Sequence, residues 1–323
     1  MNDQNLHILV SRLGLLRLVY ILKPLLALPN HRGLREFKSV VSSLPLKPLL
    51  EYQPRFLYKF LAPYATANFN QRARLSTLIN HYRFFGEAAN PLFFYSLAQN
   101  TVVWRKNFGS DECNISLSFP QKAFNEAEIS LNLYWNFALT QVVSFVIAPG
   151  TVAGSESPHT MLITQVQSFK NAEQLKEITK ALFEITPASL LVNAAYGLAT
   201  ALGIDSAAGI STQNKVGRRL HLYFDYDAFW LDFKGQHNAD VDLYQLPIPA
   251  PEKPIAEVKR NHRARTLRKR QFKEQVRESI ASYWHSTFSL GKAWVTEPKP
   301  FSELELESTY ANYEDTPKHT LKE

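Results

Sequence analysis

The chain contains only one cysteine, Cys113, so no disulfide can form within it. This usage predicts a reducing compartment. Cys113 directly follows Asp111 and Glu112, and an acidic environment disfavours the thiolate that a nucleophile needs. We therefore expect an inert thiol.

Long uncharged apolar runs are also absent. Residues 6–28 are strongly apolar, but Arg12, Arg17 and Lys23 interrupt them. A membrane-spanning helix needs about 20 apolar residues, and a signal peptide needs an unbroken apolar core, so we expect neither. The segment predicts an amphipathic helix that packs on the protein's own core, with burial in a membrane interface as the alternative. The expected location is cytoplasmic, and peripheral at a membrane under that alternative.

Several motifs that carry chemistry are missing. The nine histidines show no pair at the spacing of zinc ligands, so we predict no metal site. The sequence has no G-x-S-x-G elbow, no P-loop and no G-x-G-x-x-G turn, which excludes serine hydrolases of that kind and the common nucleotide-binding classes.

The sequence has enough hydrophobic residues to form a folded core, and its net charge is positive. Hydrophobic residues make up 45% of the chain, aromatic residues 12% and charged residues 20%. This composition predicts a folded protein rather than a disordered one. The net charge of +7 permits nucleic acid, anionic lipid or an acidic small-molecule ligand as a partner.

Hydrophobic periodicity predicts an α+β fold. Residues 1–100 read as a mainly helical region, and the clearest helix, at 68–87, has apolar residues at spacings of three and four. Residues 101–250 predict an α/β core domain with a mixed or antiparallel central sheet and flanking helices. The expected strands are 115–119, 129–137, 141–148, 161–167, 207–211 and 241–246, and the expected flanking helices are 172–183 and 187–202.

Residues 251–295 predict a long basic helix, running from about 255 to 284. Ten Lys and Arg side chains lie between positions 253 and 277. They make this segment the candidate for binding an anionic membrane surface or lipid, and the residues assigned to that role are Arg263, Arg265, Arg268, Lys269 and Arg270. A solvated surface helix is the alternative. Nucleic acid is the less favoured partner because no DNA- or RNA-binding motif accompanies the charge. Residues 296–323 predict a flexible acidic tail.

The order of these pieces resembles the VirK/YbjX family of Gram-negative bacterial proteins, over residues 34–279. The resemblance lies in LSTLINHYRFF at 75–85, LYW at 133–135, QVQS at 165–168, ATALG at 199–203, GISTQN at 209–214 and YDAFW at 226–230. It implies a virulence-associated role in envelope or lipid A homeostasis and in resistance to antimicrobial peptides, without a defined chemical activity. Ser168 stands where the family pattern leads us to expect glycine, which puts ligand binding by that turn in doubt.

A second resemblance, at the level of the fold, is to the GNAT-type acyltransferases. A strand, two helices, a strand, an aromatic segment and a final strand follow one another as in the core of those enzymes. The resemblance implies acyl-CoA as the cofactor, with its pyrophosphate at the helix N-terminus after residues 167–171. Its turn and a following asparagine make Gln167, Ser168 and Asn214 candidates for ligand binding, and Gln165 of the motif at 165–168 joins them. Trp230 is a further candidate, because the aromatic segment 226–230 can line a pocket, with a place in the core as the alternative.

His81 and Tyr82 are the candidate catalytic residues. A histidine can act as a general base near neutral pH, and a tyrosine can stabilise developing charge. The preferred alternative is that they belong to a buried polar network in the core. The leading hypothesis is therefore a family-type envelope function with no defined activity, and the second is an acyltransferase.

Overall fold

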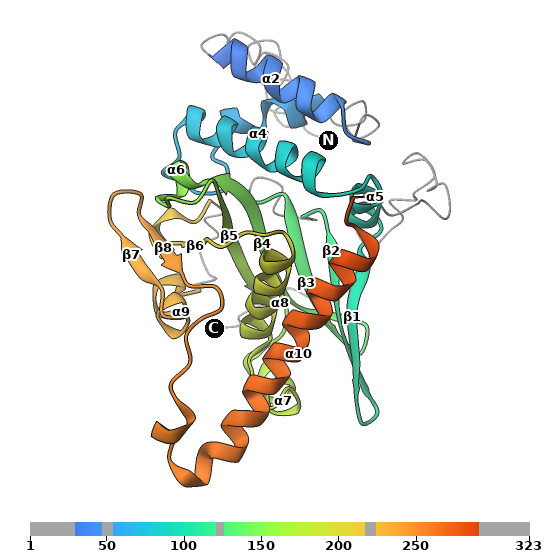
Figure 1. The fold of residues 1–323 in the computed structure, drawn as a ribbon, viewed down its shortest axis with the longest axis vertical. Helices are drawn as coiled ribbons and strands as arrows, with labels where there is room; N and C mark the ends of the chain where they lie inside the picture. Colours follow the sequence, from blue (N-terminus) through green and yellow to red (C-terminus); the bar gives the residue numbers. More distant parts are fainter. Residues whose placement is uncertain (1–29, 47–53, 121–125, 217–223, 291–323) are drawn as a thin grey trace, which may run out of the picture.

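Five antiparallel strands form the larger part of one eight-stranded sheet (Figure 1). The computed structural model describes residues 30–46, 54–120, 126–216 and 224–290. The five strands are β1 (Thr101–Phe108), β2 (Asp111–Ser118), β3 (Ile129–Trp135), β4 (Ala138–Pro149) and β5 (His159–Ser168), each paired with the next. β2 to β5 coincide with strands expected from the sequence, and the predicted antiparallel arrangement is confirmed, whereas β1 was not among the expected strands.

The remaining strands extend the sheet beyond β5. They are β6 (Ala207–Ile210), β7 (Gln236–Asn238) and β8 (Leu243–Leu246), and the full order is β1-β2-β3-β4-β5-β6-β8-β7. β6 is parallel to β5, whereas β8 is antiparallel to both β6 and β7. The connection between the parallel strands holds two helices, α7 (Ala172–Ala181) and α8 (Pro187–Ala201), because parallel neighbours require a crossover.

Helices α8 and α10 cover one face of the sheet (Figure 1). The apolar α8 packs on β3, β4 and β5, and α10 (Arg263–Thr287) lies across α8 and β1. The buried side chains of α10 begin in its third turn, and they are Phe272, Val276, Ile280 and Trp284. Gly197 lets the two helices approach closely, because a Cβ there would lie 2.5 Å from the carbonyl oxygen of Arg277.

The helices before the sheet pack on one end of it. They are α2 (His31–Ser42), η2 (Pro54–Leu61), α4 (Gln71–Ala88) and α5 (Leu92–Ala98). Asn70 caps α4 by accepting a hydrogen bond from the backbone N–H of Ala73. Phe37, Phe56 and Tyr82 join α2, η2 and α4 through ring contacts of 5.4–6.0 Å between centroids. The apolar core therefore continues from this helical region into the sheet.

The start of the basic helix was predicted wrongly. α10 begins at Arg263, and residues 255–262 form two short 3-10 turns, η4 (Ile255–Glu257) and η5 (Arg260–His262). The Arg263 guanidinium donates to the carbonyl oxygens of Val258 and Ala256, at 2.9 and 2.8 Å, and so folds this stretch back on the helix. The other short elements are α6 (Gly150–Ala153), η3 (Thr212–Asn214) and α9 (Tyr226–Asp232).

Two sequence predictions fall outside the described residues: the amphipathic helix at 6–28 and the acidic tail at 296–323. Among the helices that are described, none combines the length and apolar character needed to cross a bilayer.

Candidate functional site

A buried ion pair joins η2 to the residues just before β3. Lys59 Nζ lies 2.5 Å from Glu128 Oε1 and donates to the carbonyl oxygen of Ala127 at 3.1 Å. Both charged side chains are at most 3% exposed. The Tyr82 hydroxyl donates to the other carboxylate oxygen of Glu128. Burial lowers the pKa of Lys59, and the Glu128 charge opposes that shift.

His81 hydrogen-bonds to the part of β4 that extends beyond its pairing with β3. The pairing of β3 with β4 reaches Ile129 and Phe145 and goes no further. Beyond that point the N–H of Ile147 donates to His81 Nδ1 at 3.1 Å, and Asn80 Nδ2 donates to the Ile147 carbonyl oxygen at 2.9 Å. Two side chains of α4 thus replace the missing strand. Burial holds the pKa of His81 well below its usual value, and the nearby Lys59 charge adds to this effect.

His81 and Tyr82 are therefore both buried and hydrogen-bonded, but to different partners. Their catalytic role stays a prediction, and the arrangement has the character of the core network given as the alternative. Sequence reasoning missed Lys59 and Glu128. For Lys59 the available signal was a single charge inside the apolar stretch FLYKFL at 56–61, whereas Glu128 closely follows Glu126 and gives no such signal.

Strands β5 and β6 separate soon after they begin to pair. Their pairs are Met161 with Ala207, Leu162 with Ala208 and Ile163 with Gly209, although β5 continues to Ser168. The buried side chain of Tyr226 lies in the opening between the two strands. Its hydroxyl oxygen accepts a hydrogen bond from the backbone N–H of Val166 at 3.0 Å. At the other end of the residue, the Tyr226 N–H donates to Thr212 Oγ1 at 3.0 Å. Burial raises the pKa of Tyr226.

Polar side chains form a ladder that leads to this opening. Ser130 and Ser144 share a hydrogen bond of 2.8 Å, and Ser144 donates to Gln165 Oε1 at 2.7 Å. Gln165 in turn donates to Gln167 Oε1 at 2.8 Å. Ser168 bonds instead to Gln141 of β4, at 2.6 Å. The structure therefore brings together Gln165 and Gln167 but directs Ser168 elsewhere.

Asn214 and Trp230 lie apart from that ladder. Asn214 Nδ2 donates to Asp242 Oδ2 at 2.6 Å, and the Trp230 indole N–H donates to the carbonyl oxygen of Ile210 at 2.8 Å. Trp230 is fully buried and covers Gly209, where a Cβ would lie 2.2 Å from its ring. Ser211, the next residue after β6, is 4% exposed, and within the described part of the chain its hydroxyl has no hydrogen-bond partner.

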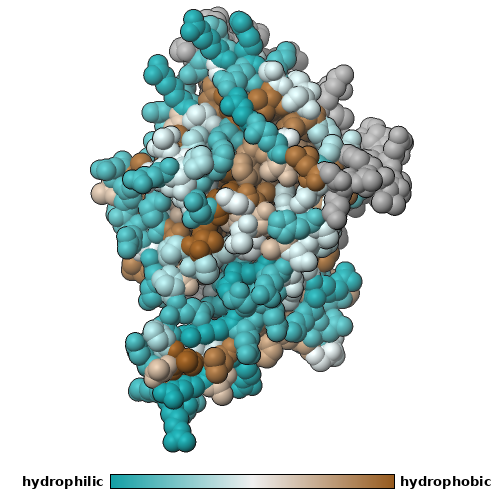
Figure 2. Space-filling view, viewed as in Figure 1, coloured by the Kyte–Doolittle hydropathy of each residue, from teal (hydrophilic) through white to brown (hydrophobic). Residues whose placement is uncertain are grey.

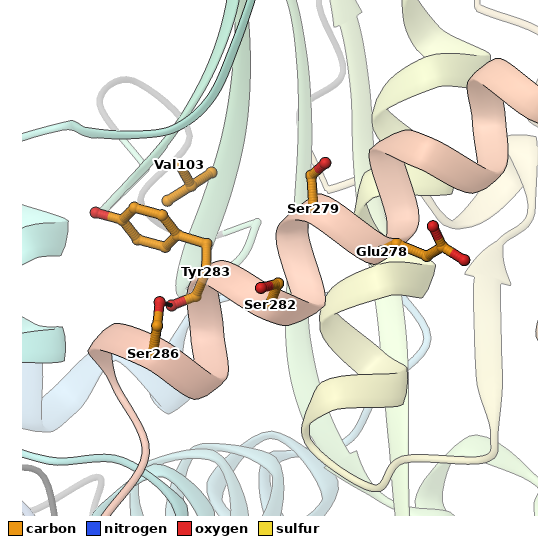
Figure 3. Close-up of a pocket in the computed structure, with 6 residues that line it drawn as sticks. All are labelled: Val103, Glu278, Ser279, Ser282, Tyr283 and Ser286. Carbon is orange, nitrogen blue, oxygen red and sulfur yellow. Dashed lines mark hydrogen bonds between the residues drawn. The ribbon is translucent and has the colours of Figure 1, made fainter.

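An open hollow lies between α10 and β1, the edge strand of the sheet (Figure 3). Its lining is Val103, Glu278, Ser279, Ser282, Tyr283 and Ser286. The pairing of β1 with β2 shifts register at Val103, and the exposed Arg105 follows on the same edge strand. A bulge and a basic side chain both discourage the addition of a further strand at this edge.

The basic segment, defined as residues 253–277, is only partly neutralised. Arg265 and Lys269 pair with Glu184, and Arg270 pairs with Glu252 at 2.5 Å. Lys259, Arg260 and Arg268 are exposed and, in the described part of the chain, have no ion-pair partner. Over α10 the surface in Figure 2 is largely hydrophilic. Of the five residues predicted to contact an anionic surface, Arg263 and Arg268 therefore have no ion-pair partner in the described part of the chain, and Arg263 donates instead to backbone carbonyl groups.

The sequence predicted an inert Cys113 thiol and no metal site, and both predictions concern groups within the described residues. Cys113 is buried in β2, and burial, helped by the charge of Glu112, raises its pKa to about 12. The thiol is therefore protonated at neutral pH. In the described ranges, no three side chains among His, Cys, Asp and Glu gather in a way that could hold a metal ion.

Comparison with known proteins gives one family and one relative. The family described as "Protein of unknown function (DUF535)" matches residues 16–282. The "Uncharacterized protein YbjX" of Escherichia coli (strain K12) is 24% identical over 262 residues, which cover 76% of this chain and 78% of that protein. No solved structure matches the chain.

Proposed function

The chain belongs to the VirK/YbjX family, matched as DUF535, and on that premise we propose that it supports envelope or lipid A homeostasis at the cytoplasmic face of the inner membrane, contributing to resistance to antimicrobial peptides. In this role the protein binds anionic lipid through the basic segment. The observation that carries this proposal is the exposed charge of Lys259, Arg260 and Arg268, at and just before the beginning of α10, for which the described residues provide no ion-pair partner.

The position of these charges suits a flat anionic surface. The first turns of α10 extend past the end of the sheet, whereas α2 lies at the opposite end of the molecule (Figure 1). Because the buried side chains of α10 begin at Phe272, the earlier turns present their side chains outward. A basic side chain near an anionic bilayer contributes about 1 kcal/mol.

Replacing Lys259, Arg260 and Arg268 together with glutamine is expected to weaken binding to vesicles of phosphatidylglycerol and phosphatidylcholine about a hundredfold. Three charges at about 1 kcal/mol each give about 3 kcal/mol, which corresponds to that factor. Sedimentation with the vesicles measures the change. The thermal stability is expected to stay unchanged, because the three side chains form no ion pair within the described residues.

The matched control neutralises Arg32, Arg35 and Lys38, which are exposed on α2. It removes the same charge from the other end of the molecule and is expected to retain nearly full binding. If both triple variants lose binding equally, net charge rather than the basic segment drives the association, and the proposal fails. The proposal also fails if the wild-type protein does not bind the anionic vesicles.

A second candidate function is acyl transfer from an acyl-CoA-type donor. Three features favour it: the separation of β5 from β6, the polar ladder that ends at Gln167, and the buried hydroxyl of Ser211, which has no hydrogen-bond partner among the described residues. A pantetheine chain could hydrogen-bond to the free backbone of diverging strands. Tyr226 fills that place and binds Val166, so a donor would have to displace its side chain.

Saturating acyl-CoA is expected to stabilise the protein by about 2.7 kcal/mol at 100 times its Kd. Thermal unfolding with acetyl-CoA and palmitoyl-CoA measures this effect. ATP is the control, since it brings phosphate charge to a basic protein without a pantetheine arm. An equal rise of the melting temperature with ATP, or no rise with either acyl-CoA, would remove the acyltransferase candidate.

A further inference from the structure

The turn between β3 and β4 holds a phenylalanine in a conformation that suits glycine. Asn136 and Phe137 both have positive φ, at 48° and 63°, as two-residue hairpin turns of this type require, and Asn-Gly is the favoured pair there. For a bulky side chain a positive φ is an outlier. Phe137 is nevertheless 79% exposed, so burial does not compensate for the strain.

The turn is held rigidly although its tip is exposed. Asn136 Nδ2 donates to Asp111 Oδ1 at 2.8 Å, and Asn136 Oδ1 accepts the N–H of Glu112 at 2.8 Å. The Asn136 N–H donates to the carbonyl oxygen of Glu112 at 2.9 Å. These bonds fix the turn to the neighbouring β1–β2 hairpin, so Phe137 is presented outward in a defined position.

Further aromatic residues lie at the same end of the sheet. Phe108 lies 5.6 Å from Trp135 and 6.0 Å from Phe183, measured between ring centroids. Phe183 follows α7, has a φ of 57° and is 36% exposed. It is thus a second exposed phenylalanine with positive φ. We call Phe108, Trp135, Phe137 and Phe183 the aromatic rim.

Basic side chains flank the aromatic rim. Lys106 Nζ lies 5.9 Å from the ring centroid of Phe108 and 5.1 Å from that of Phe272 in α10. Phe183 is 5.1 Å from Phe272, and the next residue, Glu184, binds Arg265 and Lys269. The rim therefore adjoins the basic segment. Aromatic side chains beside cationic ones favour the boundary between headgroups and acyl chains of an anionic bilayer.

We propose that the aromatic rim is a membrane anchor, in which Phe137 enters the interfacial layer of an anionic bilayer while the basic segment binds the headgroups. The anchor rests on the proposed function and adds to it a defined point of insertion. Vesicles contain lipid and no protein, so binding of the aromatic rim to vesicles distinguishes a membrane surface from a protein partner.

Phe137→Asn is expected to lower the affinity of the full chain for phosphatidylglycerol–phosphatidylcholine vesicles about tenfold, since an apolar ring no longer leaves water. Asparagine adopts positive φ more readily than phenylalanine, so the melting temperature is expected to stay level or rise. Vesicle sedimentation and thermal unfolding measure the two effects. A lower melting temperature would show that the ring stabilises the fold, and it would overturn the anchor.

A second variant, Phe137→Trp, reports on insertion directly. Compared with the parent protein, its additional fluorescence is expected to shift to the blue when the anionic vesicles are added, and an unshifted spectrum in the bound state would overturn the anchor. If the variant of Lys259, Arg260 and Arg268 loses binding while Phe137→Asn binds like the wild type, the anchor fails but the proposed function stands. If the wild-type chain does not bind vesicles, both fail.

Discussion

Replacing Lys59 with methionine is expected to destabilise the protein by about 3–5 kcal/mol, because Glu128 then keeps its charge in the core without a counter-ion. The Lys59 and Glu128 side chains are 1% and 3% exposed, so water cannot take over the role of the ammonium group. The Tyr82 hydroxyl would remain the carboxylate's donor. Urea unfolding measures the change in the free energy of unfolding.

The double variant Lys59→Met/Glu128→Gln tests the reason for the loss. It removes both charges and leaves a side-chain oxygen to accept from Tyr82, so most of the stability should return. The surface pair of Arg83 with Glu36, both 48% exposed, is the matched comparison. Arg83→Met is expected to change the free energy of unfolding by less than about 1 kcal/mol. A Lys59→Met variant no weaker than Arg83→Met would contradict the importance of the buried pair.

Gly197→Ala is expected to destabilise the protein by about 3 kcal/mol, although alanine normally favours a helix over glycine by about 1 kcal/mol. The added methyl group would lie 2.5 Å from the Arg277 carbonyl oxygen and 2.8 Å from its Cα. Both are backbone atoms of α10, so relief requires the two helices to separate. Denaturant unfolding measures the loss of stability.

Gly86→Ala in α4 is the control for that substitution. Its new methyl group would meet only the end of the Leu44 side chain, at 3.0 Å, and this flexible group can move. The expected change in stability is within about 1 kcal/mol of zero. Equal effects at Gly86 and Gly197 would show that the contact of α8 with α10 does not set the outcome.

The elements that follow a local pattern could be predicted from the sequence. β3 alternates apolar and polar residues, and α8 begins with Pro187 behind the capping residue Thr186. The order of the last strands could not be read this way. β6 joins β5 across more than 40 residues of chain, and β8 enters between β6 and β7. Such pairings depend on the twist and closure of the whole sheet rather than on neighbouring residues.

The candidate site was predictable only in part for a similar reason. The buried pair connects residues 69 positions apart, and no local pattern marks that contact. The role of His81 depends on where β3 stops pairing with β4. The exposed charge of Arg268, by contrast, was visible in the sequence. Which of its neighbours are neutralised depends on tertiary contacts: Glu184 pairs with Arg265 and Lys269, and Glu252 pairs with Arg270.

The bonds of Asn80 and His81 to Ile147 also bear on how the protein unfolds. The backbone of β4 beyond its pairing with β3 depends on α4 for its hydrogen bonds. Pulling α4 away would leave a buried N–H and carbonyl of the sheet unsatisfied, at about 1–3 kcal/mol for each group. The helical region and the sheet are thus coupled energetically, which favours a single cooperative transition over stepwise loss of the helices.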